Sequence, residues 1–260
     1  MPAGLSVAAE APELPLSTGP GSTAGAGSPG DAGLLPVLPV LRELLPRGGL
    51  ARGSVVTVPE FGLLALALAA GASAAGAWCG IAGVPEAGVL AATALGLDAD
   101  RTLLVPDPGP SWAQVVASLL DGCELVLLRR PARARDGRRP SGPPEAQVRP
   151  RLEATLRRAR GVLLVVGEWP GAQVRLRVLS QGWTGLGDGH GRLLACCAQV
   201  AADGRGEAAL TRTRWLWLPA EDGRIAAADP AALPIPHAPV PYIPAAPTPA
   251  PRRLRAAGTG

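Results

Sequence analysis

A series of short apolar runs, each without polar alternation, is separated along this chain by segments of helical character. Strands with such a composition are buried on both faces of a sheet, and helices between them are typical of parallel sheets. The pattern predicts an α/β fold with a doubly wound, mostly parallel sheet and helices on both faces. We expect its strands at residues 53–58, 77–82, 102–105, 124–128 and 162–166.

Helices are expected between these strands, at residues 63–75, 87–95, 112–120 and 151–160, after a short helix at residues 37–45. The prolines between 131 and 150 are expected to prevent a helix before Arg151. The last part of the chain differs, because residues 174–179, 193–200 and 210–218 have the pattern of strands joined by glycine-rich turns. We expect these late strands to extend the sheet in antiparallel orientation.

Low-complexity segments of alanine, proline and glycine flank the expected sheet. They carry too little apolar side chain to offset the entropy of ordering them. We therefore expect disordered tails at residues 1–32 and 219–260 around a core at residues 33–218. An insertion rich in arginine and proline interrupts this core at about residues 129–149.

Composition excludes several chemistries. Every basic residue is arginine, so the chain has no lysine for a Schiff base, for general base catalysis or for a Walker-type phosphate loop. Four cysteines without a CxxC pair and two histidines cannot complete a plausible zinc set, and neither a metal nor a disulfide framework is expected.

The uncharged residues 61–85 are long enough to cross a bilayer, but their glycines and alanines contribute little transfer energy. We therefore expect no membrane span. The first residues lack a charged segment followed by a long apolar run, so no signal peptide is indicated and a reducing cytoplasm is the expected location.

Positive charge is concentrated in one segment. Residues 129–160 hold 11 of the 25 arginines and three acids, a balance of +8, whereas the rest of the chain sums to −4. This segment is either a solvated insertion or a contact surface for the phosphates of DNA. The candidate DNA contacts within it are Arg133, Arg135, Arg138 and Arg139.

Four further arginines lie on expected strands. Arg175 and Arg177 share one face of residues 174–179, and Arg212 and Arg214 share one face of residues 210–218. If the two strands are neighbours, these arginines form a guanidinium patch with tryptophans near enough to stack on bases. The interpretation that we prefer is an edge strand with its tryptophans over the core and its arginines in solvent.

The strand, loop and alanine-rich helix at residues 53–75 are arranged as in proteins that bind phosphate at a helix N-terminus. The loop consists of Pro59, Glu60, Phe61 and Gly62. It has one glycine, no basic residue and no Ser or Thr for Mg²⁺, and its carboxylate repels a triphosphate. We expect ATP binding of the usual kind to be lost and no cofactor to be used.

Three consecutive segments carry a family resemblance. GLARGSVVTV, then LALALAAGASAAG, then WCGIAGVPEAGVLAATALGLDADRTLLVPDPGPSWAQVVASLLDGCELVLLRR resemble the core of RecA-type recombinases. Within that group the chain is similar to the actinobacterial ImuA-type accessory proteins of the mutagenic DNA-repair cassette, over about residues 44–219. The resemblance implies a RecA-like fold.

The resemblance also assigns positions to a nucleotide site, and this sequence departs from three of them. The phosphate-loop lysine has no counterpart. The catalytic glutamate falls on Val84, with Glu86 displaced by two residues, and the metal-binding aspartate falls on Arg129. Because phosphoryl transfer requires all three groups, we expect no ATP hydrolysis.

For function, the ImuA-type resemblance implies a non-catalytic adaptor of SOS-induced, error-prone translesion DNA synthesis. Its partners would be a catalytically inactive Y-family polymerase homologue and an error-prone C-family polymerase, held by the C-terminal part at about residues 174–260. Two alternatives stay open: a DNA-binding protein that acts through the arginine-rich segment, and an ATPase with an unconventional phosphate loop.

Three other groups of residues have side chains that could take part in chemistry. Asp107 and Glu168 follow expected parallel strands, where α/β sites form, although turn and capping roles are the ordinary explanation. The glycine-rich residues 182–191, which include His190, are expected to form a flexible hairpin loop. Cys196 and Cys197 are adjacent on an expected strand and are expected to be inert thiols.

Overall fold

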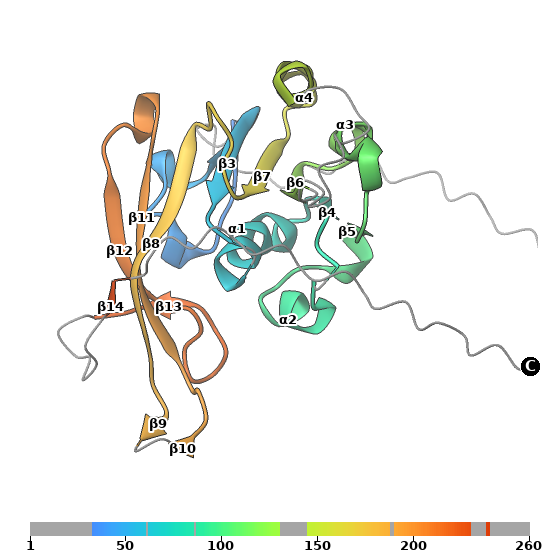
Figure 1. The fold of residues 1–260 in the computed structure, drawn as a ribbon. Helices are drawn as coiled ribbons and strands as arrows, with labels where there is room; N and C mark the ends of the chain where they lie inside the picture. Colours follow the sequence, from blue (N-terminus) through green and yellow to red (C-terminus); the bar gives the residue numbers. More distant parts are fainter. Residues whose placement is uncertain are drawn as a thin grey trace, which may run out of the picture.

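The computed structural model in Figure 1 describes residues 33–60, 62–85, 87–130, 145–187, 190–229 and 238–239. One large sheet runs through the molecule. Its parallel strands are β3 (Ser54–Val58), β4 (Cys79–Ala82), β5 (Thr102–Val105), β6 (Leu125–Arg129) and β7 (Val162–Val166). The later strands are β8 (Val174–Trp183), β11 (Cys196–Gly204), β12 (Arg212–Trp217), β13 (Ala226–Ala227) and β14 (Ala238–Pro239).

The strand order is β13-β12-β11-β8-β3-β7-β6-β4-β5, with β14 paired to β8. β8 is the boundary between the two parts of the sheet. Its first residues pair in parallel with β3, while its other edge pairs antiparallel with β11 along its length. The predicted fold class is confirmed: a mostly parallel α/β sheet is extended by late antiparallel strands.

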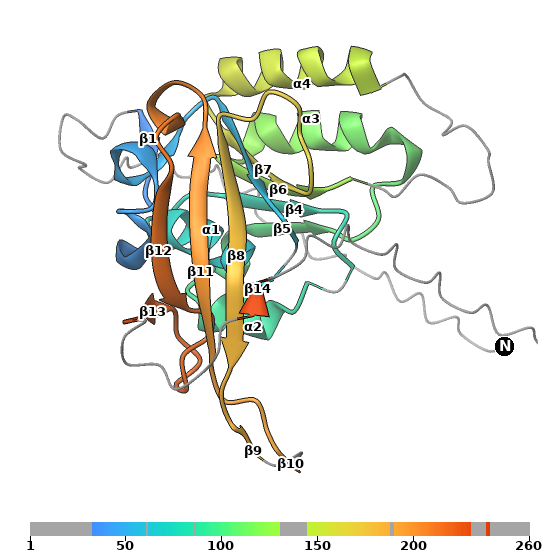
Figure 2. The ribbon, with the colours of Figure 1, turned by 60° about the vertical axis from the view of Figure 1, so that its left-hand side comes forward.

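Helices cover both faces of the parallel part. They are α1 (Leu63–Ala74), α2 (Val89–Ala94), α3 (Trp112–Gly122) and α4 (Glu145–Ala159). α1 packs with one core cluster, which includes Val56 and Leu127, while α3 and α4 pack with a second cluster on the opposite face, which includes Val55 and Leu128. In Figure 2, α3 and α4 lie side by side above the parallel strands. Successive strand residues thus enter different cores, as the period of two requires.

α1 is apolar on every side, and the structure buries nearly all of it. Gly71 allows its close approach to the preceding segment, because a Cβ at this position would lie 2.3 Å from the carbonyl carbon of Val37. A helix of Ala and Leu with little amphipathic character is stable only when it is surrounded in this way. The composition of residues 63–75 therefore indicates burial as well as helix.

Two of the helix predictions were wrong in detail. Residues 37–45 do not form an α-helix but contain one 3₁₀ segment, η1 (Pro39–Leu41), and a second, η2 (Pro46–Gly48), follows them. Pro39 holds the preceding residue in an extended conformation, so the helix cannot extend across it. The last helix begins at Glu145 and contains Pro150, although we expected no helix before Arg151. Val148 and Leu152, on either side of this proline, are buried in the second core and stabilise the helix through it.

The late strands were placed correctly, but their bounds differ from the prediction. β8 continues to Trp183, and β11 begins at Cys196 and ends at Gly204. The end of β8 leads into a separate hairpin of β9 (Leu186–Gly187) and β10 (His190–Gly191), at the expected glycine-rich residues. β1 (Leu34–Leu35) and β2 (Leu50–Ala51) form another small antiparallel pair.

Past the expected core boundary at residue 218 the sheet continues. β13 pairs with β12, and β14 pairs with β8. Several stretches of the predicted tails and insertion lie outside the described residues: 230–237 and 240–260 of the C-terminal tail, all of the N-terminal tail at 1–32, and 131–144 of the insertion. Among the helices that the structure describes, none is both long and apolar enough to cross a bilayer.

Candidate functional site

The candidate site lies at the carboxyl edge of the parallel strands, where ligands bind in doubly wound sheets. The loop after β3 contributes Pro59, Glu60 and Gly62, while Phe61 lies outside the described residues. α1 begins directly after this loop, with Gly62 as an N-cap that makes no side-chain capping bond. The structure therefore has the strand, loop and helix N-terminus of a phosphate site.

The chemistry of this loop does not suit a phosphate. A helix N-terminus attracts anions through its free N–H groups and the helix dipole. Glu60 is exposed and places a negative charge beside that N-terminus, and the first turn of α1 has only apolar side chains. A triphosphate would meet a carboxylate here in place of a lysine.

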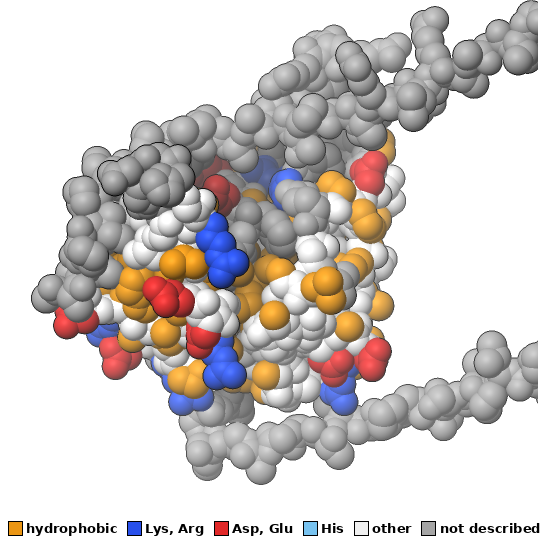
Figure 3. Space-filling model, turned by 90° about the horizontal axis from the view of Figure 1, so that it is seen from below, with side chains coloured by type: hydrophobic (Ala, Val, Ile, Leu, Met, Phe, Trp, Pro, Cys, Tyr) orange, Lys and Arg blue, Asp and Glu red, His pale blue; other side chains and the backbone are white. Residues whose placement is uncertain are grey.

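A cavity of about 290 Å³ opens between this loop and the late strands. Leu64 of α1, Val178 of β8 and Ala198 of β11 contribute apolar walls, and Glu60 and Gln181 contribute polar groups. Figure 3 views the molecule from below and shows hydrophobic side chains in the middle of the described surface, between acidic and arginine side chains. The cavity thus offers mostly apolar contacts where a nucleotide site would offer phosphate donors.

The two expected acidic positions are also unsuited to catalysis. Val84 is 2% exposed and packs in the core cluster on the α1 side of the sheet. Arg129 ends β6 and, by strand alternation, shares the face of Leu127, which packs toward α1. A guanidinium on this face would repel the Mg²⁺ that an aspartate holds there in RecA-type proteins.

Gly83 brings these two strand ends together. Its backbone has a φ of +74°, and a Cβ at this position would lie 1.9 Å from the carbonyl oxygen of Arg129. Its N–H donates to the carbonyl oxygen of Val105 at 2.9 Å. The residue between β4 and Val84 is therefore fixed by contacts with the ends of both neighbouring strands.

The four strand arginines do not form one patch. We expected such a patch only if their two strands were neighbours. β11 lies between β8 and β12, so the two arginine-bearing strands are not neighbours. The register sets Arg214 opposite Val200 and Arg177 opposite Ala201, which is the next residue of β11. Arg175 with Arg177 and Arg212 with Arg214 therefore lie on opposite faces of the sheet.

Each pair of arginines has its own acidic partner or carbonyl acceptors. Arg175 and Arg177 both pair with Asp203 of β11, whereas Arg214 pairs with Glu43 at 2.9 Å. Arg212 donates to backbone carbonyl oxygens near the end of the β11–β12 connection. The remaining candidate contacts, Arg133, Arg135, Arg138 and Arg139, lie outside the described residues.

Asp107 and Glu168 have local structural contacts. Asp107 Oδ1 accepts a hydrogen bond from the N–H of Gly109 at 2.9 Å, which is the capping role expected of such a residue. At Glu168 the backbone carbonyl accepts from Arg130, whose guanidinium also lies over the ring of Trp169. The Asp107 carboxylate therefore has a turn-capping role, and the Glu168 contact is made by its backbone.

The cysteines are buried and reduced. Burial, with the adjacent Cys197 as a second cause, raises the pKa of Cys196 to about 11. Burial also raises the pKa of Cys197. Within the described part of the chain, no three His, Cys, Asp or Glu side chains gather where they could hold a metal ion.

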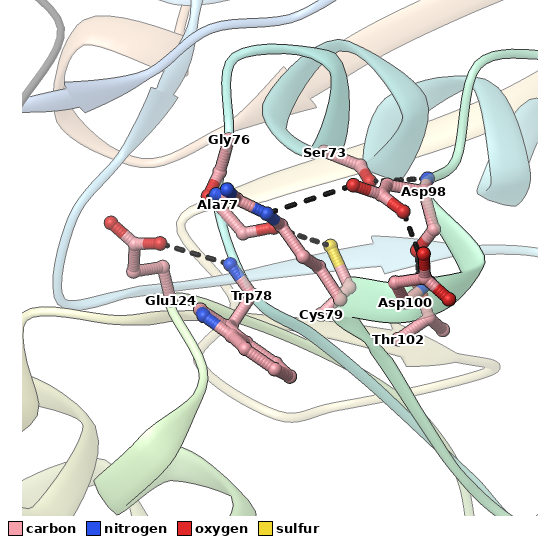
Figure 4. Close-up of polar contacts among 10 residues, drawn as sticks. Ser73, Gly76, Ala77, Trp78, Cys79, Asp98, Asp100, Thr102 and Glu124 are labelled. Atoms are coloured by element: carbon pink, nitrogen blue, oxygen red, sulfur yellow. Dashed lines mark hydrogen bonds and ion pairs between the residues drawn. The ribbon is translucent and has the colours of Figure 1, made fainter. Parts of the chain in front are cut away.

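A polar network that the sequence did not reveal connects the segments before the amino ends of the parallel strands, opposite the candidate site (Figure 4). Glu124, just before β6, accepts from the N–H of Trp78 at 3.1 Å and from Arg52 at 3.2 Å. Ser73 at the end of α1 accepts from the N–H of Asp98 at 2.9 Å. These contacts link residues that precede β4, β5 and β6, and they fix the strand starts, far along the strands from the carboxyl edge. Isolated residues at such spacings form no motif that could have predicted them.

Comparison with known proteins gives three results. Residues 43–171 match the family model of the MT3502 N-terminal domain. Over 140 residues the chain is 36% identical to the uncharacterized protein Rv3395c of Mycobacterium tuberculosis (strain ATCC 25618 / H37Rv). That match spans 52% of this chain and 63% of the relative, so the chain covers less than two thirds of the relative's length.

The structure is similar to the crystal structure of the RadB recombinase. The TM-score is 0.50 at 17% sequence identity, and the match covers 73% of this chain and 97% of the recombinase chain. Sequence identity this low supports an inference about fold alone. Together with the sheet order, the match gives the chain a RecA-like fold of the RadB kind.

Proposed function

We propose that this protein is a non-catalytic adaptor of an SOS-induced, error-prone translesion synthesis complex, built on a RecA-like fold. It would link a catalytically inactive Y-family polymerase homologue to an error-prone C-family polymerase. The RecA-like fold and the segment resemblance to ImuA-type accessory proteins support this proposal. The role as an adaptor requires protein contacts and no nucleotide chemistry.

The observation that carries the proposal is the composition of the carboxyl edge. Glu60 stands beside the α1 N-terminus, Val84 is buried in the core, and Arg129 ends β6. Phosphoryl transfer is catalysed by positioning and by neutralisation of charge on the phosphates and the metal ion. The charges of Glu60 and Arg129 would repel the phosphates and the metal ion, and Val84 cannot bind either of them. This composition favours a scaffold over an ATPase.

The end of the sheet at β5 offers a surface for a protein partner. Leu103 and Leu104 of this strand and Leu90 of α2 are exposed, Leu90 to 87%. In the described sheet, β5 is the terminal strand and no described strand pairs with its outer edge. An exposed apolar group beside a strand edge is typical of protein interaction sites.

Co-purification with the Y-family polymerase homologue tests the adaptor role. We expect the full chain to form a stable complex whether or not MgATP is present. Failure to form a complex, or formation only with MgATP, would contradict the proposal.

Two variants then locate the contact. Deletion of residues 240–260 keeps β13 and β14, so loss of the complex would assign the contact to the C-terminal segment rather than to the sheet. Leu90→Arg changes a side chain that is 87% exposed and should fold normally. Loss of the complex in this variant alone would assign the contact to the β5 end.

DNA binding through residues 129–160 is the second candidate function, and the concentration of arginine there favours it. Binding dominated by phosphate contacts weakens steeply with salt. Its test is the affinity for single- and double-stranded DNA at low ionic strength, and absence of binding there would exclude this function.

A further inference from the structure

One face of β8, β11 and β12 carries an arginine pair that the proposed function does not use. Arg175 and Arg177 alternate with the buried Leu176 and therefore point to the same side of β8. Asp203 is the cross-strand partner of Arg175 on β11 and shares that side. The three side chains form one cluster, which we name the Arg175 cluster.

The geometry of the Arg175 cluster fixes both guanidinium groups. Nε and Nη2 of Arg175 lie 3.0 and 2.9 Å from Asp203 Oδ1, and Arg177 Nη2 bonds to Asp203 Oδ2. The Asp203 side chain is 12% exposed, whereas the arginine side chains are 58% and 59% exposed. A buried carboxylate thus anchors two arginines whose outer parts face solvent.

This arrangement leaves donors for a ligand. Each guanidinium has five N–H donors, and the contacts with Asp203 use one or two of them on each arginine. The cluster retains a net positive charge, because two cations share one anion. Paired arginines held in place in this way suit phosphate oxygens, which accept from the planar fork of the guanidinium.

The face of the sheet that carries the Arg175 cluster also carries an aromatic side chain. Figure 2 shows β8, β11 and β12 in front, with α1 behind them and α3 and α4 beside them. Trp215 of β12 lies opposite Gln199 on the same side of the sheet as Arg177 and is half-buried, so part of its surface reaches solvent. It stands two strands away from β8, or roughly 10 Å at a strand spacing of ~4.8 Å.

We propose that this face binds single-stranded nucleic acid, with backbone phosphates on Arg175 and Arg177 and a base against Trp215. Charge complementarity selects a polyanion, and an aromatic side chain beside a cationic track is the combination that binds single strands without sequence preference. A duplex would keep its bases stacked inside and could use only the charges. The site goes beyond the adaptor role and does not depend on any polymerase partner.

The arginine pair of β12, on the opposite face of the sheet, supplies a matched control. We would measure fluorescence anisotropy of a fluorescein-labelled oligothymidylate with the full chain, the R175A/R177A variant and the R212A/R214A variant. We expect R175A/R177A to weaken binding at least about tenfold and to reduce the salt slope by about 1.4, since each lost contact to a single strand contributes about 0.7. R212A/R214A, which removes the same charge from the other face, should stay within about twofold of the parent. Equal losses in both variants, or no loss in R175A/R177A, would overturn the proposal.

A chemical footprint of the unmutated protein tests the same site without depending on the folding of any variant. Modification of arginines by phenylglyoxal, followed by mass spectrometry, should show Arg175 and Arg177 protected by the oligothymidylate and Arg212 and Arg214 unchanged. Unlabelled duplex of equal length should compete poorly. Unprotected Arg175 and Arg177, or competition by duplex as strong as by single strand, would contradict a single-strand site.

Discussion

Gly83 allows the ends of β4 and β6 to come into contact. Replacement by alanine places a Cβ 1.9 Å from the Arg129 carbonyl oxygen and also strains a backbone with φ of +74°. We expect Gly83→Ala to lower the free energy of unfolding by about 3 kcal/mol or more, measured by urea denaturation. The backbone of β6 cannot move away without breaking its pairing with β4 and β7.

Gly167→Ala is the control for backbone strain alone. Gly167 has a φ of +92° and no atom within 4 Å of a Cβ. This variant should cost only about 1–2 kcal/mol. Equal losses for the two variants would show that the contact with Arg129 contributes nothing.

The Cys79 thiol reports how well the core excludes water. Burial raises the pKa of Cys79 to about 12, from 9.0 for an ordinary thiol, with the nearby Cys123 as a second cause. At pH 8 only about one molecule in ten thousand would carry the thiolate. We expect no reaction of Cys79 with a thiol reagent at pH 8 until the chain is unfolded, and rapid native-state labelling would contradict its burial.

The same pKa shift fixes the sign of a pH dependence. The unfolded thiol ionises near pH 9, whereas the folded one stays protonated to about pH 12. The contribution of Cys79 to the free energy of unfolding is therefore constant below pH 9 and falls as the pH rises from 9 to 12.

At the scale of elements, α4 tolerates a proline that its sequence makes unfavourable. Pro150 removes one helical hydrogen bond and crowds the preceding turn, and its residue is exposed. We expect Pro150→Ala to raise the free energy of unfolding by about 1–3 kcal/mol in urea denaturation. Pro106→Ala, at an exposed proline outside any helix, should change it by less than about 0.5 kcal/mol. A loss of stability in Pro150→Ala would mean that the kink at this position improves the packing of Val148 and Leu152.

The elements that the sequence predicts well are those with one dominant signal. Residues 102–105 and 162–166 are strands at the expected bounds because short apolar runs of this length are typical of strands. The run at 162–166 is fully buried inside the sheet, whereas the run at 102–105 forms its terminal strand. The start of α4 was missed because tertiary burial of Val148 overrides the local effect of Pro150. The two-residue strand β14 has no sequence signal, since its pairing with β8 depends on the sheet already being formed.

The candidate sites divide in the same way. The departures of residues 59–62 from the pattern of a phosphate loop are local in sequence, so the sequence alone predicts them. The separation of the arginines into two pairs could not be predicted, because it depends on β11 lying between β8 and β12. Strand order is a property of the whole sheet, and alternation within a strand does not determine it.

At the scale of the molecule, the net charge of +4 conceals an uneven distribution. Residues 129–160 sum to +8 and the rest of the chain to −4. In the described part, several acids of that remainder are used in ion pairs with arginine, such as Glu124 with Arg52 and Asp203 with Arg175. The net charge of the sequence therefore does not predict the charge of any one part of the described surface. We expect electrostatic binding only at specific faces.

The central claim is that a RecA-like fold serves here as a scaffold without nucleotide chemistry. Calorimetric titration of the folded full chain with MgATP tests it most directly, with an ATP-binding RecA-type recombinase as the positive control. The account predicts no saturable heat for this chain at millimolar nucleotide, because Glu60 puts a carboxylate beside the N-terminus of α1 and the family resemblance sets Arg129 where the metal-binding aspartate would be. Saturable binding with one-to-one stoichiometry would contradict it.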